Sequence, residues 1–173
     1  MSHYRRNYLA GGTFFFTVKL ANSKSCLLVE QIDLLREAYA FVQQRYAFET
    51  VAVCVLPNHI HAVWALPDGD DDYSLRWRLL KTKFSDAFES LENISASKKR
   101  RREKGIWQRR FYEHTVCDDA DLRRCVDYVY FNPVKHGLVN SVKEWPFSSF
   151  HRDVRRGLFA LDWGGSKESS VMN

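Results

Sequence analysis

Two histidines in an apolar segment have the types and spacing needed to bind a metal ion. His59 and His61 alternate within the run HIHAVWAL, so in a strand both imidazoles would project from the same face. Two neutral imidazoles on one face form a ready pair of ligands for a divalent ion. A histidine pair alone is a weak signal. The alternative interpretation is that the two histidines are only polar residues at the start of a half-exposed strand.

A tyrosine and an asparagine further along the chain have the spacing of neighbours on a helix. Tyr128 and Asn132 lie four residues apart in an apolar-periodic segment, which places a phenol and a carboxamide on the same helix flank. A phenol is a weak nucleophile at neutral pH and needs help to attack a phosphate. Alternatively, Tyr128 is a half-buried core residue and Asn132 only ends the helix before Pro133.

The elements that must position these residues follow from hydrophobic periodicity. We predict strands over 13–18, 49–56, 59–66 and 107–116, and helices over 30–46, 74–91, 118–132 and 151–156. Ser74 and Asp118 are expected to cap their helices, and Pro133 to end the third one. This order predicts an α+β, ferredoxin-like or RRM-like fold: an antiparallel βαββαβ core with helices packed on it, plus a C-terminal helix that carries Tyr128.

Length and composition narrow the class of protein. The chain has 173 residues, of which 45% are hydrophobic and 14% aromatic, which suits one domain with its own core and excludes wholesale disorder. No apolar run approaches the roughly 18–20 residues of a membrane span, and no signal segment is recognisable at the N-terminus. We expect one domain over 1–163 and a flexible tail over 164–173. The cysteines lack paired spacing, which predicts reduced thiols in a cytoplasmic protein.

The net charge of +5 is unevenly distributed along the chain. The segment 98–110 (KKRRREKGIWQRR) has eight basic residues and one acidic residue, so the rest of the chain is slightly acidic. This segment predicts a polyanionic partner. Trp107, Phe111 and Tyr112 could stack on bases or belong to the sheet core, whereas Trp64 and Trp145 are assigned to the core. The acidic run 68–72 (DGDDD) allows two interpretations of equal weight, that it is only a solvated loop or that it has a further role.

Four separated motifs resemble a known family: LPNHIHAVWALP, WQRRFYEH, DYVYFNPVKHG and WPFSSFHRDVRRG. In this order they are similar to the Y1 transposases of the HUH nuclease superfamily, and most of all to the REP-associated tyrosine transposases. The opening YRRNYLAGGTFFFTV resembles that branch too, so the resemblance covers about residues 4–160. It implies that His59 and His61 are metal ligands and that Tyr128 is the nucleophile. Asn132 occupies the position of a third ligand, which is usually Gln in insertion-sequence relatives.

The resemblance also implies an activity, a cofactor and a partner. We expect a single-stranded DNA endonuclease and strand transferase that acts on REP-like hairpin DNA through a 5′-phosphotyrosine intermediate, with Mg²⁺ or Mn²⁺ as the ion. The resemblance favours a monomer, without membrane contact, in the bacterial cytoplasm at the nucleoid. Two alternatives stay open: a hairpin-binding protein of the same fold that does not cleave, and a metallohydrolase that activates water and does not use Tyr128.

Basic residues in several parts of the chain are expected to follow DNA phosphates. They are Arg5, Arg6, Lys98, Lys99, Arg100, Arg101, Arg102, Arg109, Arg110, Arg152, Arg155 and Arg156. The competing tyrosines, Tyr112 and Tyr130, do not share a helix flank with Asn132. His114 and His136 are candidates for contacts to the metal ligands or to phosphate without a definite role, and Glu113 is a candidate acid near the site.

Overall fold

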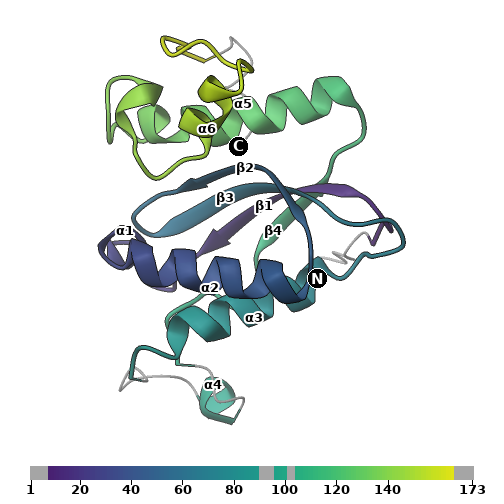
Figure 1. The fold of residues 1–173 in the computed structure, drawn as a ribbon. Helices are drawn as coiled ribbons and strands as arrows, with labels where there is room; N and C mark the ends of the chain where they lie inside the picture. The colour runs from purple at the N-terminus through teal and green to yellow at the C-terminus, as the bar shows by residue number, and fades with distance from the viewer. Residues whose placement is uncertain (1–7, 90–95, 101–103, 166–173) are drawn as a thin grey trace, which may run out of the picture.

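Four antiparallel strands form a single sheet in the computed structural model, which describes residues 8–89, 96–100 and 104–165 (Figure 1). The strands are β1 (Thr13–Lys19), β2 (Glu49–Val55), β3 (His59–Ala65) and β4 (Tyr112–Thr115). Their spatial order is β2-β3-β1-β4, with all neighbouring pairs antiparallel. This is the ferredoxin-like order, so the predicted fold class is confirmed.

Helices cover both faces of this sheet (Figure 1). One face is covered by α1 (Leu27–Glu30), α2 (Ile32–Arg45) and α3 (Tyr73–Ser85), with α4 (Ala96–Arg100) beyond α3. The opposite face is covered by α5 (Asp119–Lys135), η1 (Val142–Glu144) and α6 (Phe150–Arg155). None of the helices in the described ranges is both long and apolar enough to cross a membrane.

The strand alternation explains why the protein has two cores. Phe14 and Phe16 of β1 pack towards α2 and α3, while Phe15 between them packs towards α5. The aromatic run of β1 therefore supplies both faces. In β3, Trp64 is fully buried in the first core, as predicted, and Val63 belongs to the second.

Three predicted elements have boundaries that differ from those in the structure. The helix expected over 74–91 is α3, which ends at Ser85 and is capped by Asp72, not by Ser74, because the Asp72 carboxylate accepts the Leu75 N–H at 2.8 Å. The helix capped by Asp118 continues through Pro133, since the His136 N–H still bonds to the Asn132 carbonyl. The strand expected over 107–116 forms only as β4, and residue 107 makes just an isolated bridge to Leu20, the residue after β1.

The acidic run 68–72 has a structural role that its composition conceals. Arg76 of α3 is almost fully buried and donates to both carboxylate oxygens of Asp70, at 2.7 and 3.0 Å. The same guanidinium donates to backbone carbonyls of Tyr46, Ala47 and Asp72. The run 68–72 is therefore a largely exposed loop in which Asp70 and Asp72 also hold the start of α3.

We expect Asp70→Ala to lower the free energy of unfolding by about 2–3 kcal/mol, because it leaves a buried guanidinium without its counter-ion. Asp33→Ala is the matched control: it breaks an exposed ion pair with Arg36 and should cost less than about 1 kcal/mol. Urea unfolding followed by circular dichroism measures both. Equal losses for the two variants would show that the Asp70–Arg76 pair is no more important than a surface pair.

Candidate active site

His59 and His61 lie on the same face of β3, as the alternation predicted, and this face is turned towards α5. Their ring centroids are 4.8 Å apart, and the ring of His61 lies 5.1 Å from that of Tyr128. Ile60, between the two histidines, is buried in the opposite core. In the ladder with β1, His61 pairs with Thr17 and His59 with Lys19.

Hydrogen bonds at the Nδ1 atoms orient both imidazoles. Nδ1 of His61 is bonded to the Thr17 hydroxyl at 2.9 Å, and Nδ1 of His59 to the Asn58 side-chain oxygen at 2.6 Å. Such bonds leave the Nε2 atoms available as ligands and hold the rings in place for that role. Nε2 of His61 is buried and has no hydrogen-bond partner within the ranges that the structure describes.

Asn132 supplies a third polar group, and it comes from α5. Its side chain is fully buried, and neither Oδ1 nor Nδ2 has a hydrogen-bond partner of regular geometry among the described residues. The carboxamide lies close enough to both imidazoles to oppose the fall in their pKa. Buried polar atoms without partners are rare and costly, so the group formed by His59, His61 and Asn132 is one that a bound cation would complete.

The surroundings keep both histidines neutral at physiological pH. Burial, followed by the nearby charges of His136 and Lys19, lowers the pKa of His59 to about 4. Burial and the neighbouring histidines hold the pKa of His61 well below its ordinary value. A neutral imidazole is the form that binds metal, so no proton has to leave before an ion can be held at pH 7.

Tyr128 lies next to the histidine pair and is half-buried. Its ring makes edge contacts with Phe15 at 5.6 Å and with His61 at 5.1 Å, and Nζ of Lys135 lies 4.9 Å from its centroid. Asn132 and Lys135 follow Tyr128 at i+4 and i+7, so the three side chains run along one stripe of α5.

The competing tyrosines are less suited to act as the nucleophile. Tyr130 is buried and donates its hydroxyl to Asp153, and burial together with that carboxylate raises its pKa. Tyr112 is exposed on β4 and lies against Phe15, with centroids 6.2 Å apart.

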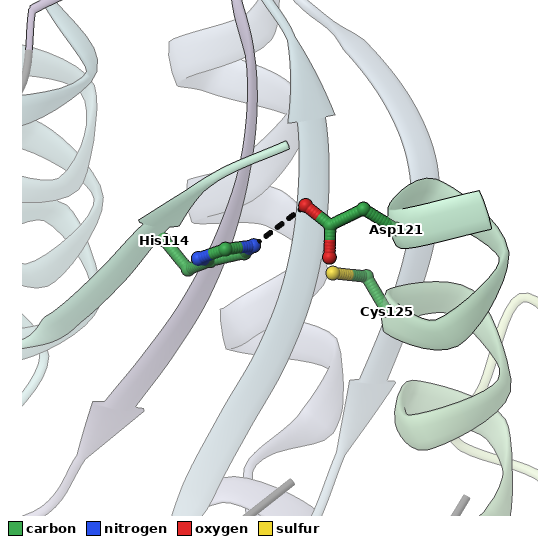
Figure 2. A group of neighbouring side chains, drawn as sticks. All are labelled: His114, Asp121 and Cys125. Atoms are coloured by element: carbon green, nitrogen blue, oxygen red, sulfur yellow. Dashed lines mark hydrogen bonds and ion pairs between the residues drawn. The ribbon is translucent and has the colours of Figure 1, made fainter. Parts of the chain in front are cut away.

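Figure 2 shows a second group of polar side chains at the other end of α5: His114 from β4, with Asp121 and Cys125 from the first turns of the helix. Their potential ligand atoms lie within 4.8 Å of one another. Asp121 nevertheless already accepts bonds from His114 at 2.8 Å, from the Cys117 N–H at 3.0 Å and from Arg124 at 3.3 Å.

These hydrogen bonds attach the start of α5 to β4 and to the loop before the helix, and we call this group the anchor of α5. Burial and the charge of Asp121 raise the pKa of Cys125 to about 12, which keeps the thiol protonated and a poor ligand at neutral pH. His114, which had no definite role in the sequence interpretation, thus ties β4 to the first turn of the helix that carries Tyr128. All four cysteines are free thiols.

The structure contradicts the prediction for Glu113 and gives His136, whose role was open, a place at the site. Glu113 pairs with Phe16 and is buried on the α2/α3 side of the sheet, so the expectation of an acid near the site is wrong. His136 lies at the site, with its ring 5.2 Å from that of His59. Its spacing of i+4 from Asn132 and i+8 from Tyr128 was the available signal.

The aromatic residues near the basic run divide between core and surface. Trp107 is buried and donates to the Ser85 hydroxyl, and Phe111 packs half-buried against the same core. Of the three candidates for base stacking, Tyr112 alone is exposed. Trp145 is partly buried and donates its indole N–H to the Val55 carbonyl.

The structure places the basic candidates at opposite edges of the sheet. Arg109 and Arg110 are exposed, and the Gln108 N–H bonds to the Lys19 carbonyl, which sets this segment beside the end of β1. Arg152 donates to the Thr50 and Val51 carbonyls and to Asp153, so it holds α6 on β2.

The remaining basic candidates are exposed or lie outside the description. Arg100, Arg155 and Arg156 are exposed. Arg5, Arg6, Arg101 and Arg102 lie outside the described residues, as do the side chains of Lys98 and Lys99. DNA binding by this set stays a prediction. So does the flexible tail, because residues 166–173 are not described either.

Fold and site together define a ferredoxin-like protein in which a two-histidine strand faces a tyrosine helix. No protein-family model matches the chain. It is 50% identical over 165 residues to the REP-associated tyrosine transposase of Escherichia coli K12, covering 95% of this chain and 92% of that protein. It is 45% identical over 172 residues to a Haemophilus influenzae Rd protein assigned to the same family, covering 99% and 98%.

A solved structure agrees with these relatives. The chain superposes with a TM-score of 0.85 and 49% identity on a REP-associated tyrosine transposase bound to a REP hairpin, covering 96% of this chain and 93% of that one. The chain belongs to the REP-associated tyrosine transposases.

The anchor at the start of α5 gives a prediction for acid stability. Although burial opposes it, the bonds from the Cys117 N–H and from His114 hold the pKa of Asp121 below its ordinary value. Asp121 therefore stabilises the fold above the unfolded-state pKa near 4, and this contribution is lost as pH falls through the folded-state value. We expect Asp121→Asn to cost about 1–2 kcal/mol at pH 7, with a smaller further loss than wild type between pH 5 and 3.

Asp119→Asn is the control, because Asp119 is exposed and shares the first turn of α5. Urea unfolding at pH 7, 5 and 3 measures all three proteins. If Asp121→Asn and wild type lose stability in parallel with falling pH, the carboxylate does not anchor the helix.

Proposed function

We propose that this transposase-family protein is a metal-dependent nuclease and strand transferase that cuts single-stranded DNA beside a hairpin and becomes joined to it through Tyr128. One observation carries the proposal. Tyr128 lies beside half-buried His59 and buried His61 and Asn132, a group in which Nε2 of His61 and both carboxamide atoms have no hydrogen-bond partner of regular geometry among the described residues. The structural relative that is bound to a REP hairpin supports hairpin DNA as the ligand.

The donor set can hold a divalent ion, and the phosphate of the substrate favours a hard one. His59 and His61 would bind it through Nε2, because their Nδ1 atoms are engaged by Asn58 and Thr17, and Asn132 through its amide oxygen. Mg²⁺ or Mn²⁺ suits a phosphate ligand best, although imidazoles also accept Zn²⁺. When bound, such an ion polarises a phosphoryl oxygen and takes up developing negative charge.

Tyr128 is the group that would form the covalent bond. Its phenol oxygen attacks phosphorus and gives up its proton, and the bond between phosphorus and the 3′ oxygen breaks. That oxygen takes up a proton and leaves as a free 3′-hydroxyl, while the 5′ phosphate stays on Tyr128. Edge contacts with Phe15 and His61 limit the orientations of the ring and so favour attack from one direction. Because the new phosphodiester keeps the bond energy, attack by another 3′-hydroxyl rejoins DNA without ATP.

The surface around the site supports a DNA partner and a monomeric active form. Tyr112 is exposed and touches Phe15, which also touches Tyr128, so a base stacked on Tyr112 would add about 1–3 kcal/mol near the cut. Arg109 and Arg110 follow Gln108, whose N–H bonds to the carbonyl of Lys19 at the end of β1. Lys19 is the residue of β1 that pairs with His59. Because α5 packs on the sheet of its own chain, one chain supplies the nucleophile and all three donors.

The first test is a covalent protein–DNA adduct. A hairpin oligonucleotide with a single-stranded flank, labelled on the 3′ side of the cut, is incubated with Mn²⁺ and analysed on a denaturing gel. We expect an adduct with wild type and with Tyr112→Phe, and none with Tyr128→Phe, which keeps the ring but loses the attacking oxygen. An adduct with Tyr128→Phe would reject the nucleophile assignment. Cleavage by wild type without an adduct would favour an activated-water hydrolase, and binding without cleavage would favour a hairpin-binding protein.

The second test concerns the ion itself. We expect Mn²⁺ to raise the melting temperature of wild type, because an ion that binds only the folded state stabilises it. His61→Ala should abolish this rise, Asn132→Ala should reduce it, and His151→Ala on α6 should leave it unchanged. Differential scanning calorimetry with and without Mn²⁺, followed by EDTA, measures the effect. An undiminished rise in His61→Ala would place the ion elsewhere.

A further inference from the structure

Two lysines approach the proposed ion site from different elements. Lys19 of β1 pairs with His59 in the antiparallel ladder, so both side chains leave the sheet on the same face. Lys135 comes from the last turn of α5, and its Nζ lies 4.9 Å from the ring centroid of Tyr128. Both lysines are exposed, so a ligand at the site can reach them.

The charges of these lysines act on the same small region. Lys19 is the ladder partner of His59, and Lys135 lies against Tyr128, whose ring contacts that of His61. His136 in turn lies against His59, with ring centroids 5.2 Å apart. The two lysines therefore flank the space around His59 and Tyr128, Lys19 from the sheet and Lys135 from the helix packed on it.

The proposed chemistry requires positive charge at this place. His59, His61 and Asn132 are all neutral donors, so the ion that they would hold brings the only positive charge of this group, and it faces more than one negative group. The substrate brings an anionic phosphodiester, and the phenol adds another negative charge as it loses its proton. Lysine binds phosphate as a point charge and stabilises charge that grows during phosphoryl transfer.

We propose that Lys19 and Lys135 form a phosphate clamp that holds the backbone of single-stranded DNA at the site, binding the phosphate that Tyr128 attacks and its immediate neighbour. This inference rests on the proposed function and extends it to the residues that position the substrate. The group formed by His114, Asp121 and Cys125 offers no comparable site, because Asp121 is already satisfied by three donors.

Binding is tested first, in a Tyr128→Phe background that removes the attacking oxygen. The affinity for a fluorescent hairpin oligonucleotide with a single-stranded flank is measured over a series of salt concentrations with Mn²⁺ present. We expect Lys19→Gln and Lys135→Gln each to reduce the slope of log affinity against log salt by about 0.7. Lys83→Gln is the matched control, because Lys83 is an exposed lysine of α3 on the opposite side of the sheet. Unchanged slopes in both test variants would overturn the clamp.

The rate of adduct formation is then measured with Tyr128 intact, in single turnovers at saturating DNA. We expect Lys135→Gln to slow the adduct at least tenfold, Lys135→Arg to retain most of the rate, and Lys83→Gln to match wild type. A reduced salt slope with an unchanged rate would show that the lysines bind backbone away from the attacked phosphate, which also overturns the proposal. If wild type forms no adduct, the proposed function fails, while the salt slopes still decide whether the lysines contact DNA.

Discussion

The register of the β1–β3 ladder is the constraint on which the site depends. It places the aromatic side chains of Phe16 and Trp64 in one core, and the polar groups of Thr17 and His61 on the sheet face that α5 covers. A slip of one residue would exchange these faces and bury the imidazoles among aromatic rings. The apolar packing under α2 and α3 therefore secures the position of the polar residues on the other side.

The polar groups in the first turn of α5 have hydrogen-bond partners, whereas a buried polar side chain near its C-terminal end has none of regular geometry among the described residues. Its first turn is fixed by the Asp118 cap and by the bonds of Asp121 to His114 and Cys117, and its middle packs Cys125 into the second core. At the other end, the carboxamide of Asn132 is buried without regular partners among the described residues. Such a group costs stability, so the strong contacts of the first half allow the second half to keep it.

The sequence predicted what depends on local spacing and missed what depends on distant partners. The alternation placed His59 and His61 on one strand face, and the four-residue step placed Tyr128 and Asn132 on one helix flank, whereas the contact between these two surfaces comes from the packing of α5. The structural role of Arg152 could not be predicted, because its carbonyl partners on β2 lie about a hundred residues away. The burial of Glu113 likewise follows from its pairing with β1 and not from its own neighbours in the chain.

The site lies at the C-terminal end of α5, and this has an electrostatic consequence. Aligned peptide dipoles give the end of a helix a partial negative charge equivalent to about half an elementary charge. This end of α5 therefore attracts a cation and repels a phosphate, in contrast to the helix N-termini at which many proteins bind phosphates. Any DNA strand that reaches Tyr128 must approach against the field of the helix that carries it. The positive charge that makes this approach favourable has to come from outside the helix backbone.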